Sequence, residues 1–64
     1  MKYKATLNSM DFGHVNGFGD TQRKAINSAV KAYKELCLNH FGRTPAPEFL
    51  RWIRNVALIE EYES

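Results

Sequence analysis

The chain has 64 residues, a single cysteine and a formal net charge of +2, and 44% of its residues are hydrophobic. This length predicts one small domain spanning residues 1–64 and leaves little room for an enclosed active site. One cysteine excludes an internal disulfide, and the sequence shows neither a run of about 18 apolar residues nor a charged-then-apolar leader, so we expect a cytoplasmic protein without a membrane segment.

The charges are unevenly distributed along the chain. All nine Lys and Arg residues precede position 55, whereas Glu60, Glu61 and Glu63 lie within the last five residues. Residues 1–58 therefore carry nine bases against four acids. A basic body can attract anionic partners, and an acidic tail can fold back and mask it. The alternative is a solvated surface of mixed charge.

The N-terminal residues have the pattern of a β-hairpin. Tyr3, Ala5 and Leu7 alternate with polar residues, which is the period of a strand with one buried and one solvated face. The Asn, Ser and Asp residues that follow favour a turn, and a second extended segment comes after them. We predict an antiparallel hairpin with strands over about 2–8 and 12–18.

A long amphipathic helix is predicted over about 22–40. Thr21 is a typical N-cap residue and Gly42 stands where a C-terminal cap belongs. Apolar residues three and four apart define its expected buried face. These are Ala25, Ile26, Ala29, Val30, Ala32, Tyr33, Leu36, Cys37 and His40.

Residues 47–60 permit two interpretations. Pro47 suits the first helical position, and Trp52, Ile53 and Val56 follow a helical stripe, which favours a second helix over about 47–60. The glutamates near the end would lie at the negative end of the helix dipole, however, so a short helix followed by a third strand is the alternative. Both interpretations give an α+β fold.

The joint between the hairpin and the long helix resembles known modules. Gly-Asp-Thr at 19–21, followed by a helix face with Ala25, Ala29 and Ala32, resembles the strand-to-helix step of HicB-like antitoxin modules. It is also similar to the last strand-to-helix step of double-stranded RNA-binding domains. The likeness covers residues 2–38 and implies a helix packed on a sheet. In size and pattern the chain also resembles small phage-encoded proteins that inhibit host enzymes, which implies docking onto a host complex.

Residues suited to catalysis or metal binding are few. Cys37 and His40 are three apart, a spacing that can place both side chains on one metal ion, but only His14 and a few acids could complete the ligand set. Nothing marks an oxyanion hole or a carboxylate that would orient His40 as a base. Gly17 and Gly19 could let the backbone approach a phosphate, but Asp20 would repel it. We therefore expect no enzyme activity, no cofactor and no metal site.

The C-terminal segment is the first candidate binding surface. It carries more apolar side chains than one buried face accommodates, and Trp beside Arg is typical of protein-binding hot spots. A core anchor is the alternative role for Trp52. The predicted protein-binding residues are Phe49, Arg51, Trp52, Arg54 and Leu58. We expect a non-catalytic regulatory or inhibitory protein that docks onto another protein, with a homodimer as one form of such docking.

The long helix offers the second candidate surface. Its polar face carries basic side chains that could each neutralise a phosphate, and the wet face of the first strand could extend the set. These residues are Lys2, Lys4, Arg23, Lys24, Lys31 and Lys34. The alternative function is therefore a nucleic-acid-binding module, although charges on an exposed helix face also serve solubility alone.

Overall fold

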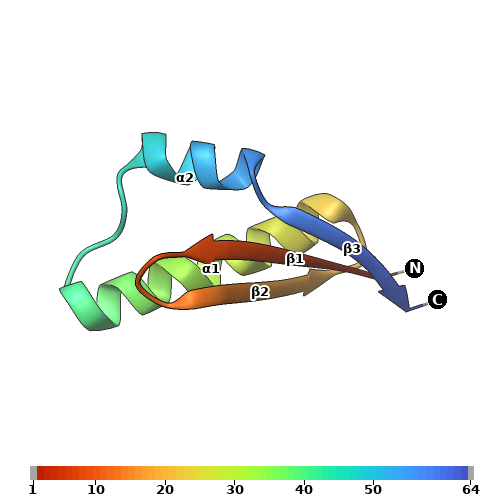
Figure 1. The fold of residues 1–64 in the computed structure, drawn as a ribbon, viewed down its shortest axis with the longest axis horizontal. Coiled ribbons are helices and arrows are strands. Elements are labelled where there is room, and N and C mark those ends of the chain that lie inside the picture. Colours follow the sequence, from red (N-terminus) through yellow and green to blue (C-terminus); the bar gives the residue numbers. More distant parts are fainter. Residues whose placement is uncertain (1, 64) are drawn as a thin grey trace.

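A computed structural model describes residues 2–63 and shows the predicted α+β fold (Figure 1). Two strands and a long helix come first, as expected, and a short helix and a third strand follow. The elements in chain order are β1 (Lys2–Ser9), β2 (Gly13–Gly19), α1 (Gln22–Phe41), α2 (Pro47–Asn55) and β3 (Leu58–Glu63). Neither helix among the described residues combines the length and apolarity needed to cross a membrane.

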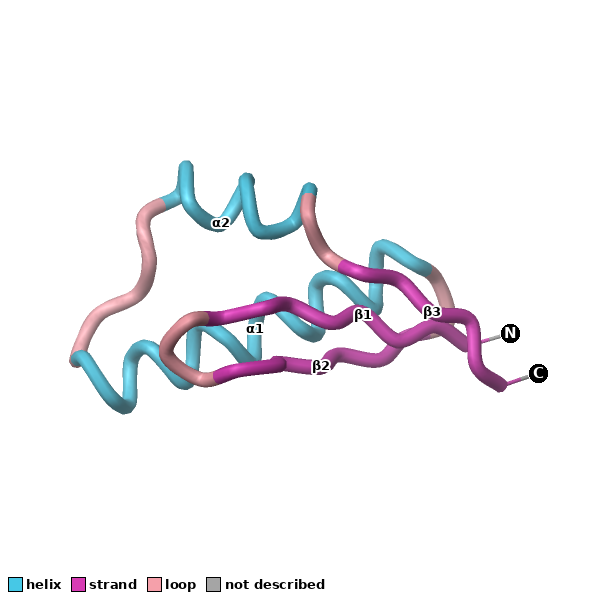
Figure 2. Tube along the Cα trace, viewed as in Figure 1, coloured by secondary structure: helices cyan, strands magenta, loops and turns pink. Residues whose placement is uncertain are grey.

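The three strands form one antiparallel sheet with the order β2-β1-β3. β1 and β2 pair without interruption from Tyr3 with Gly19 to Ser9 with Gly13. β3 pairs with the first part of β1, and the register shifts between Lys2 and Tyr3. α1 covers one face of the sheet, and α2 lies on the other side of β1 from β2 and leads directly into β3 (Figure 2). Within residues 2–63, no helix covers the second face of the sheet.

The core lies between α1 and the sheet, as the sequence periods predict. The Thr21 Oγ1 atom accepts a hydrogen bond of 3.1 Å from the backbone nitrogen of Lys24, and Gly42 closes the helix with φ of 73°. His40 is exposed, so the buried stripe ends at Cys37, one turn earlier than predicted. The buried residues are Ala5, Leu7, Val15, Ala25, Ala29, Val30, Tyr33, Cys37 and Ile53.

The C-terminal segment forms a short helix followed by a third strand, which is the second of the two predicted alternatives. A single helix over 47–60 is wrong, because α2 ends at Asn55 and the chain becomes extended from Leu58. Continuing the helix would place Glu60 and Glu61 at its negative end. It would also leave the second edge of β1 without backbone hydrogen-bonding partners, which β3 supplies.

Candidate protein-docking surface

Three large apolar side chains surround one hollow where the β1–β2 turn comes near α2. Met10 is fully exposed, and Trp52 and Phe49 are 55% and 40% exposed. Tyr33 lies at the buried side of this hollow. We call Met10, Tyr33, Phe49 and Trp52 the end patch. The remaining residues that line the hollow are Asn8, Ser9 and Asp11.

Turn chemistry places Met10 outside the core. The Ser9 Oγ atom accepts hydrogen bonds from the backbone nitrogens of Asp11 at 3.2 Å and Phe12 at 3.1 Å. A serine side chain that bonds to the backbone two and three residues later holds the chain in a tight turn. Phe12 packs inward against the ring of Tyr33, at a centroid distance of 6.0 Å. Met10 is left at the tip of the turn without apolar cover.

Helical spacing brings the two rings of α2 together. Phe49 and Trp52 are three residues apart and therefore share one side of the helix, and their ring centroids are 5.6 Å apart. Phe49 also lies 6.0 Å from the ring of Tyr33 on α1. Ile53, which follows Trp52, is fully buried and attaches α2 to the core. The core anchor is thus Ile53, and Trp52 is the more exposed of these two neighbours.

Tyr33 forms the rigid floor of the end patch, since it is only 5% exposed. Burial raises the pKa of its hydroxyl above the ordinary value of 10.0, and Cys37 and Asp11 raise it further, while a hydrogen bond with Ser9 lowers it. The hydroxyl therefore stays protonated at neutral pH. It is a neutral hydrogen-bonding group at the base of the hollow.

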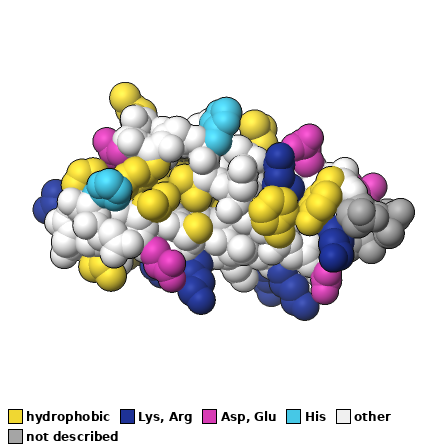
Figure 3. All heavy atoms as spheres, turned by 90° about the horizontal axis from the view of Figure 1, so that it is seen from below, with side chains coloured by type: hydrophobic (Ala, Val, Ile, Leu, Met, Phe, Trp, Pro, Cys, Tyr) yellow, Lys and Arg dark blue, Asp and Glu magenta, His cyan; other side chains and the backbone are white. Residues whose placement is uncertain are grey.

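Hydrophobic side chains are exposed in more than one place on the face that Figure 3 shows. One group lies at the left end of the molecule, which in Figure 1 holds the β1–β2 turn and the end of α1, and other hydrophobic side chains lie in the right half beside Lys and Arg side chains. Many of the Lys and Arg side chains in this view lie along its lower edge.

The structure brings together some of the predicted protein-binding residues. Phe49 and Trp52 join the end patch, and Arg51 is exposed on the same helix. Arg54 instead donates a hydrogen bond of 2.6 Å from its Nη1 atom to Asn27 Oδ1 and so links α2 to α1. Leu58 is 60% exposed but lines a different hollow on the open face of the sheet.

Sequence reasoning missed two members of the end patch. Met10 had a weak signal, since it is a large apolar residue among turn-forming polar residues. Tyr33 was predicted to be buried, which is correct, but nothing in its helical spacing showed that the C-terminal rings would pack near it. The site depends on a contact between segments far apart in the chain.

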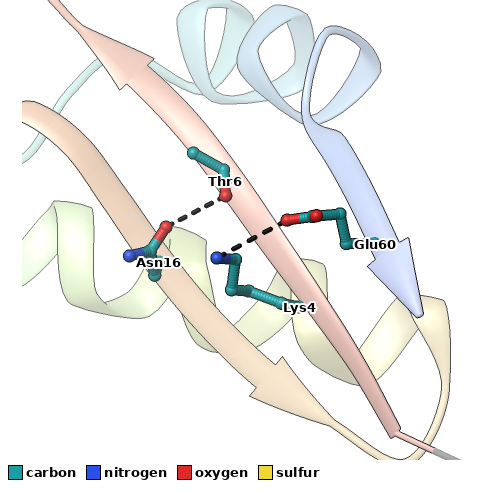
Figure 4. Close-up of polar contacts among 4 residues, drawn as sticks. All are labelled: Lys4, Thr6, Asn16 and Glu60. Atoms are coloured by element: carbon teal, nitrogen blue, oxygen red, sulfur yellow. Dashed lines mark hydrogen bonds and ion pairs between the residues drawn. The ribbon is translucent and has the colours of Figure 1, made fainter. Parts of the chain in front are cut away.

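The basic residues divide between two faces. Arg23, Lys24, Lys31 and Lys34 are all exposed on α1. Lys2 and Lys4 instead alternate with the β1 side chains that pack against this helix, so they lie on the open face of the sheet. The Lys4 Nζ atom is 3.5 Å from Glu60 Oε1 on β3 (Figure 4). The predicted six-residue set therefore does not form one continuous surface.

The open face of the sheet also carries an exposed aromatic pair. Phe18 on β2 and Tyr62 on β3 are 52% and 48% exposed, and their ring centroids are 5.6 Å apart. The pair spans β1, so its existence depends on strand order and register. The sequence periods alone did not predict it.

The residues considered for metal binding do not form a site. Cys37 is buried, whereas His40 is exposed with its ring 5.1 Å from that of Phe12. Across the described part of the chain, no three His, Cys, Asp or Glu side chains are grouped so that they could hold a metal ion.

Comparisons with protein-family models, with curated proteins and with solved structures find no match to this chain. The resemblances to HicB-like modules, to double-stranded RNA-binding domains and to small phage-encoded inhibitors therefore stay predictions.

Proposed function

We propose that this chain is a non-catalytic regulatory or inhibitory protein that docks onto another protein through the end patch. One observation carries the proposal: among the large hydrophobic side chains that are exposed on the described residues, Met10, Phe49 and Trp52 line the same hollow. Clustered exposed apolar residues are uncommon in small monomeric domains unless a partner covers them.

The chemistry of the end patch suits a binding hot spot. Trp is among the residues most enriched at energetically dominant interface positions, and the flexible thioether side chain of Met adapts to the shape of a partner. Tyr33 and the buried Ile53 hold Phe49 and Trp52 in place before binding. Such preorganisation lowers the entropic cost of association.

The lining of the hollow indicates the kind of group that it accepts. Rings and the Met10 side chain form most of the wall, and Asp11 and Asn8 supply acceptor oxygens at its margin. We therefore infer a partner that inserts an apolar side chain flanked by a hydrogen-bond donor. Arg51, exposed on α2, adds a positive charge close by along the helix.

The test compares single variants in affinity capture from a host lysate treated with nuclease. Trp52→Ser removes the larger exposed ring of the end patch, and Leu38→Ser is the matched control because Leu38 is 51% exposed on α1 outside the hollow. We expect one protein to be retained by the wild type and by Leu38→Ser and to be lost with Trp52→Ser. With that partner purified, Trp52→Ala should weaken binding by about 2 kcal/mol or more, measured by calorimetry.

Equal retention of every captured protein by wild type and Trp52→Ser, with both variants folded by circular dichroism, would refute docking through the end patch. So would a partner whose capture depends on Leu38 and not on Trp52. Met10→Ser provides a second readout, since Met10 makes little contact with the fold and its removal should weaken binding without changing stability.

One observation favours nucleic-acid binding as a second candidate function. Within residues 2–63, none of Arg23, Lys24, Lys31 and Lys34 forms an ion pair with an acid, and all are exposed on α1. Free cations along one helix can each contact a phosphate.

Binding to labelled single-stranded and duplex oligonucleotides should be measured across salt concentrations. Binding that weakens steeply with salt and that is abolished by exchanging Lys24, Lys31 and Lys34 for Glu would favour this alternative. Under the docking proposal, the same triple variant should retain the captured protein partner.

A further inference from the structure

We propose that β2 pairs antiparallel with β2 of a second copy of this chain, so that two three-stranded sheets join into one of six strands. β2 is at one edge of the sheet, and its seven residues pair with β1 on one side only. Alternate backbone N–H and C=O groups of an edge strand point outward and can complete their hydrogen bonds with another strand. This surface is distinct from the end patch.

Charge distinguishes the two edges of the sheet. β3, at the opposite edge, contains Glu60 and Glu61, and two such strands side by side would repel each other. β2 has the sequence GHVNGFG, without Lys, Arg, Asp, Glu or Pro. Charged residues and proline are the usual protection of an edge strand against pairing. β3 is therefore protected and β2 is not.

The side chain of Asn16, at the middle of β2, bonds to β1 through its oxygen and leaves its amide nitrogen on the side of the free edge. Thr6 on β1 donates a hydrogen bond of 3.0 Å from its Oγ1 atom to Asn16 Oδ1. Figure 4 shows the carboxamide nitrogen of Asn16 pointing away from β1. An exposed amide donor held in this direction lies where the neighbouring strand of a second copy would add its side chains.

Pairing of β2 with β2 of a second copy gives a symmetric contact, whereas pairing of β2 with β3 does not. Full overlap of two antiparallel β2 strands places the two-fold axis at Asn16 and sets each Phe18 opposite His14 of the second copy. Phe18 is 52% exposed, and cross-strand aromatic pairs stabilise sheets. This contact is isologous and closes at two copies. Pairing of β2 with β3 would instead be head-to-tail and would leave two free edges for further growth.

The test is sedimentation velocity on the 64-residue chain over a range of concentrations. We expect a concentration-dependent shift from the 7.4 kDa monomer to a species of twice that mass, without larger assemblies. Asn16→Lys should raise the dissociation constant about tenfold or more, because like charges would face each other at the two-fold axis. Leu58→Lys adds the same charge to β3 on the same face and should leave the dimer unchanged.

Mixed samples with one isotope-labelled and one unlabelled copy give a second measurement. Nuclear Overhauser contacts between the Phe18 ring and His14 of the other copy are expected. A monomer at millimolar concentration would overturn the proposal, as would a dimer that survives Asn16→Lys and dissociates with Trp52→Ser. The last outcome would place self-association at the end patch and would leave β2 without a role in it.

Discussion

A Cβ atom added at Gly17 would lie 2.0 Å from the backbone nitrogen of Ala29, so these two residues fix how closely α1 approaches β2. The same atom would lie 2.6 Å from the carbonyl oxygen of Ala25. Both neighbours are backbone atoms of a helix and cannot rotate aside. Because α1 also carries Tyr33, this close contact helps to position the floor of the end patch.

Gly17→Ala is expected to be among the most destabilising single substitutions in the chain. Insertion of a methyl group here forces α1 away from β2, and overpacking of this kind costs about 2 to 3 kcal/mol. A domain of this length has about 3 to 10 kcal/mol of unfolding free energy in total. Urea denaturation followed by circular dichroism should therefore show a large loss of stability.

Gly42→Ala is the matched control for crowding. Gly42 has φ of 73° and nothing within 4 Å of an added Cβ atom, so its substitution carries only the conformational cost of the left-handed region, about 1 kcal/mol. If the two variants lose equal stability, the close contact between α1 and β2 is not present in solution.

Truncation of Ile53 should mainly lower stability, whereas truncation of Trp52 should mainly weaken partner binding. Ile53 is fully buried and is the residue that attaches α2 to the core, so Ile53→Ala should lower the unfolding free energy by about 2 to 4 kcal/mol. Trp52 is 55% exposed, so Trp52→Ala should cost less than about 1 kcal/mol while it removes partner binding. Chemical denaturation and the capture assay measure the two effects separately.

A Trp52→Ala variant as unstable as Ile53→Ala would show that Trp52 anchors the core, which was the alternative taken from the sequence. Arg51→Ala, exposed on the same helix, is the control for loss of helix propensity and side-chain entropy. Its stability should match that of the wild type within about 0.5 kcal/mol.

The parts of the fold with a clear period could be predicted from sequence. Alternation at Tyr3, Ala5 and Leu7 gave the correct inward face of β1, and the three-and-four spacing placed Val30 and Tyr33 in the core. In these segments the local pattern and the tertiary packing favour the same side of each element.

The C-terminal segment could not be decided in the same way. Trp52 and Ile53 are neighbours on a helix whose apolar residues exceed one face, and only its position beside β1 determines which of them is buried. The strand that follows forms because β1 has a free edge, which is a tertiary cause absent from the local pattern. The end patch depends on the same contacts, so the sequence indicated Phe49 and Trp52 as binding residues but not Met10 and Tyr33.

Stability should fall in alkaline solution through Tyr33. Burial, with smaller contributions from Cys37 and Asp11, raises the pKa of the Tyr33 hydroxyl in the folded protein above 10.0. Between the unfolded and folded pKa values the folded state holds more protons, so the unfolding free energy is at its full value below about pH 10 and decreases as the pH rises further.

Tyr33→Phe should make the decrease above pH 10 shallower, because it removes the hydroxyl whose pKa burial raises. Urea denaturation of wild type and Tyr33→Phe at several pH values from 8 to 11 measures both slopes. Identical slopes for wild type and Tyr33→Phe would mean that the Tyr33 hydroxyl is equally solvated in the folded and unfolded chains. Such a result would contradict its placement beneath Phe49 as the floor of the end patch.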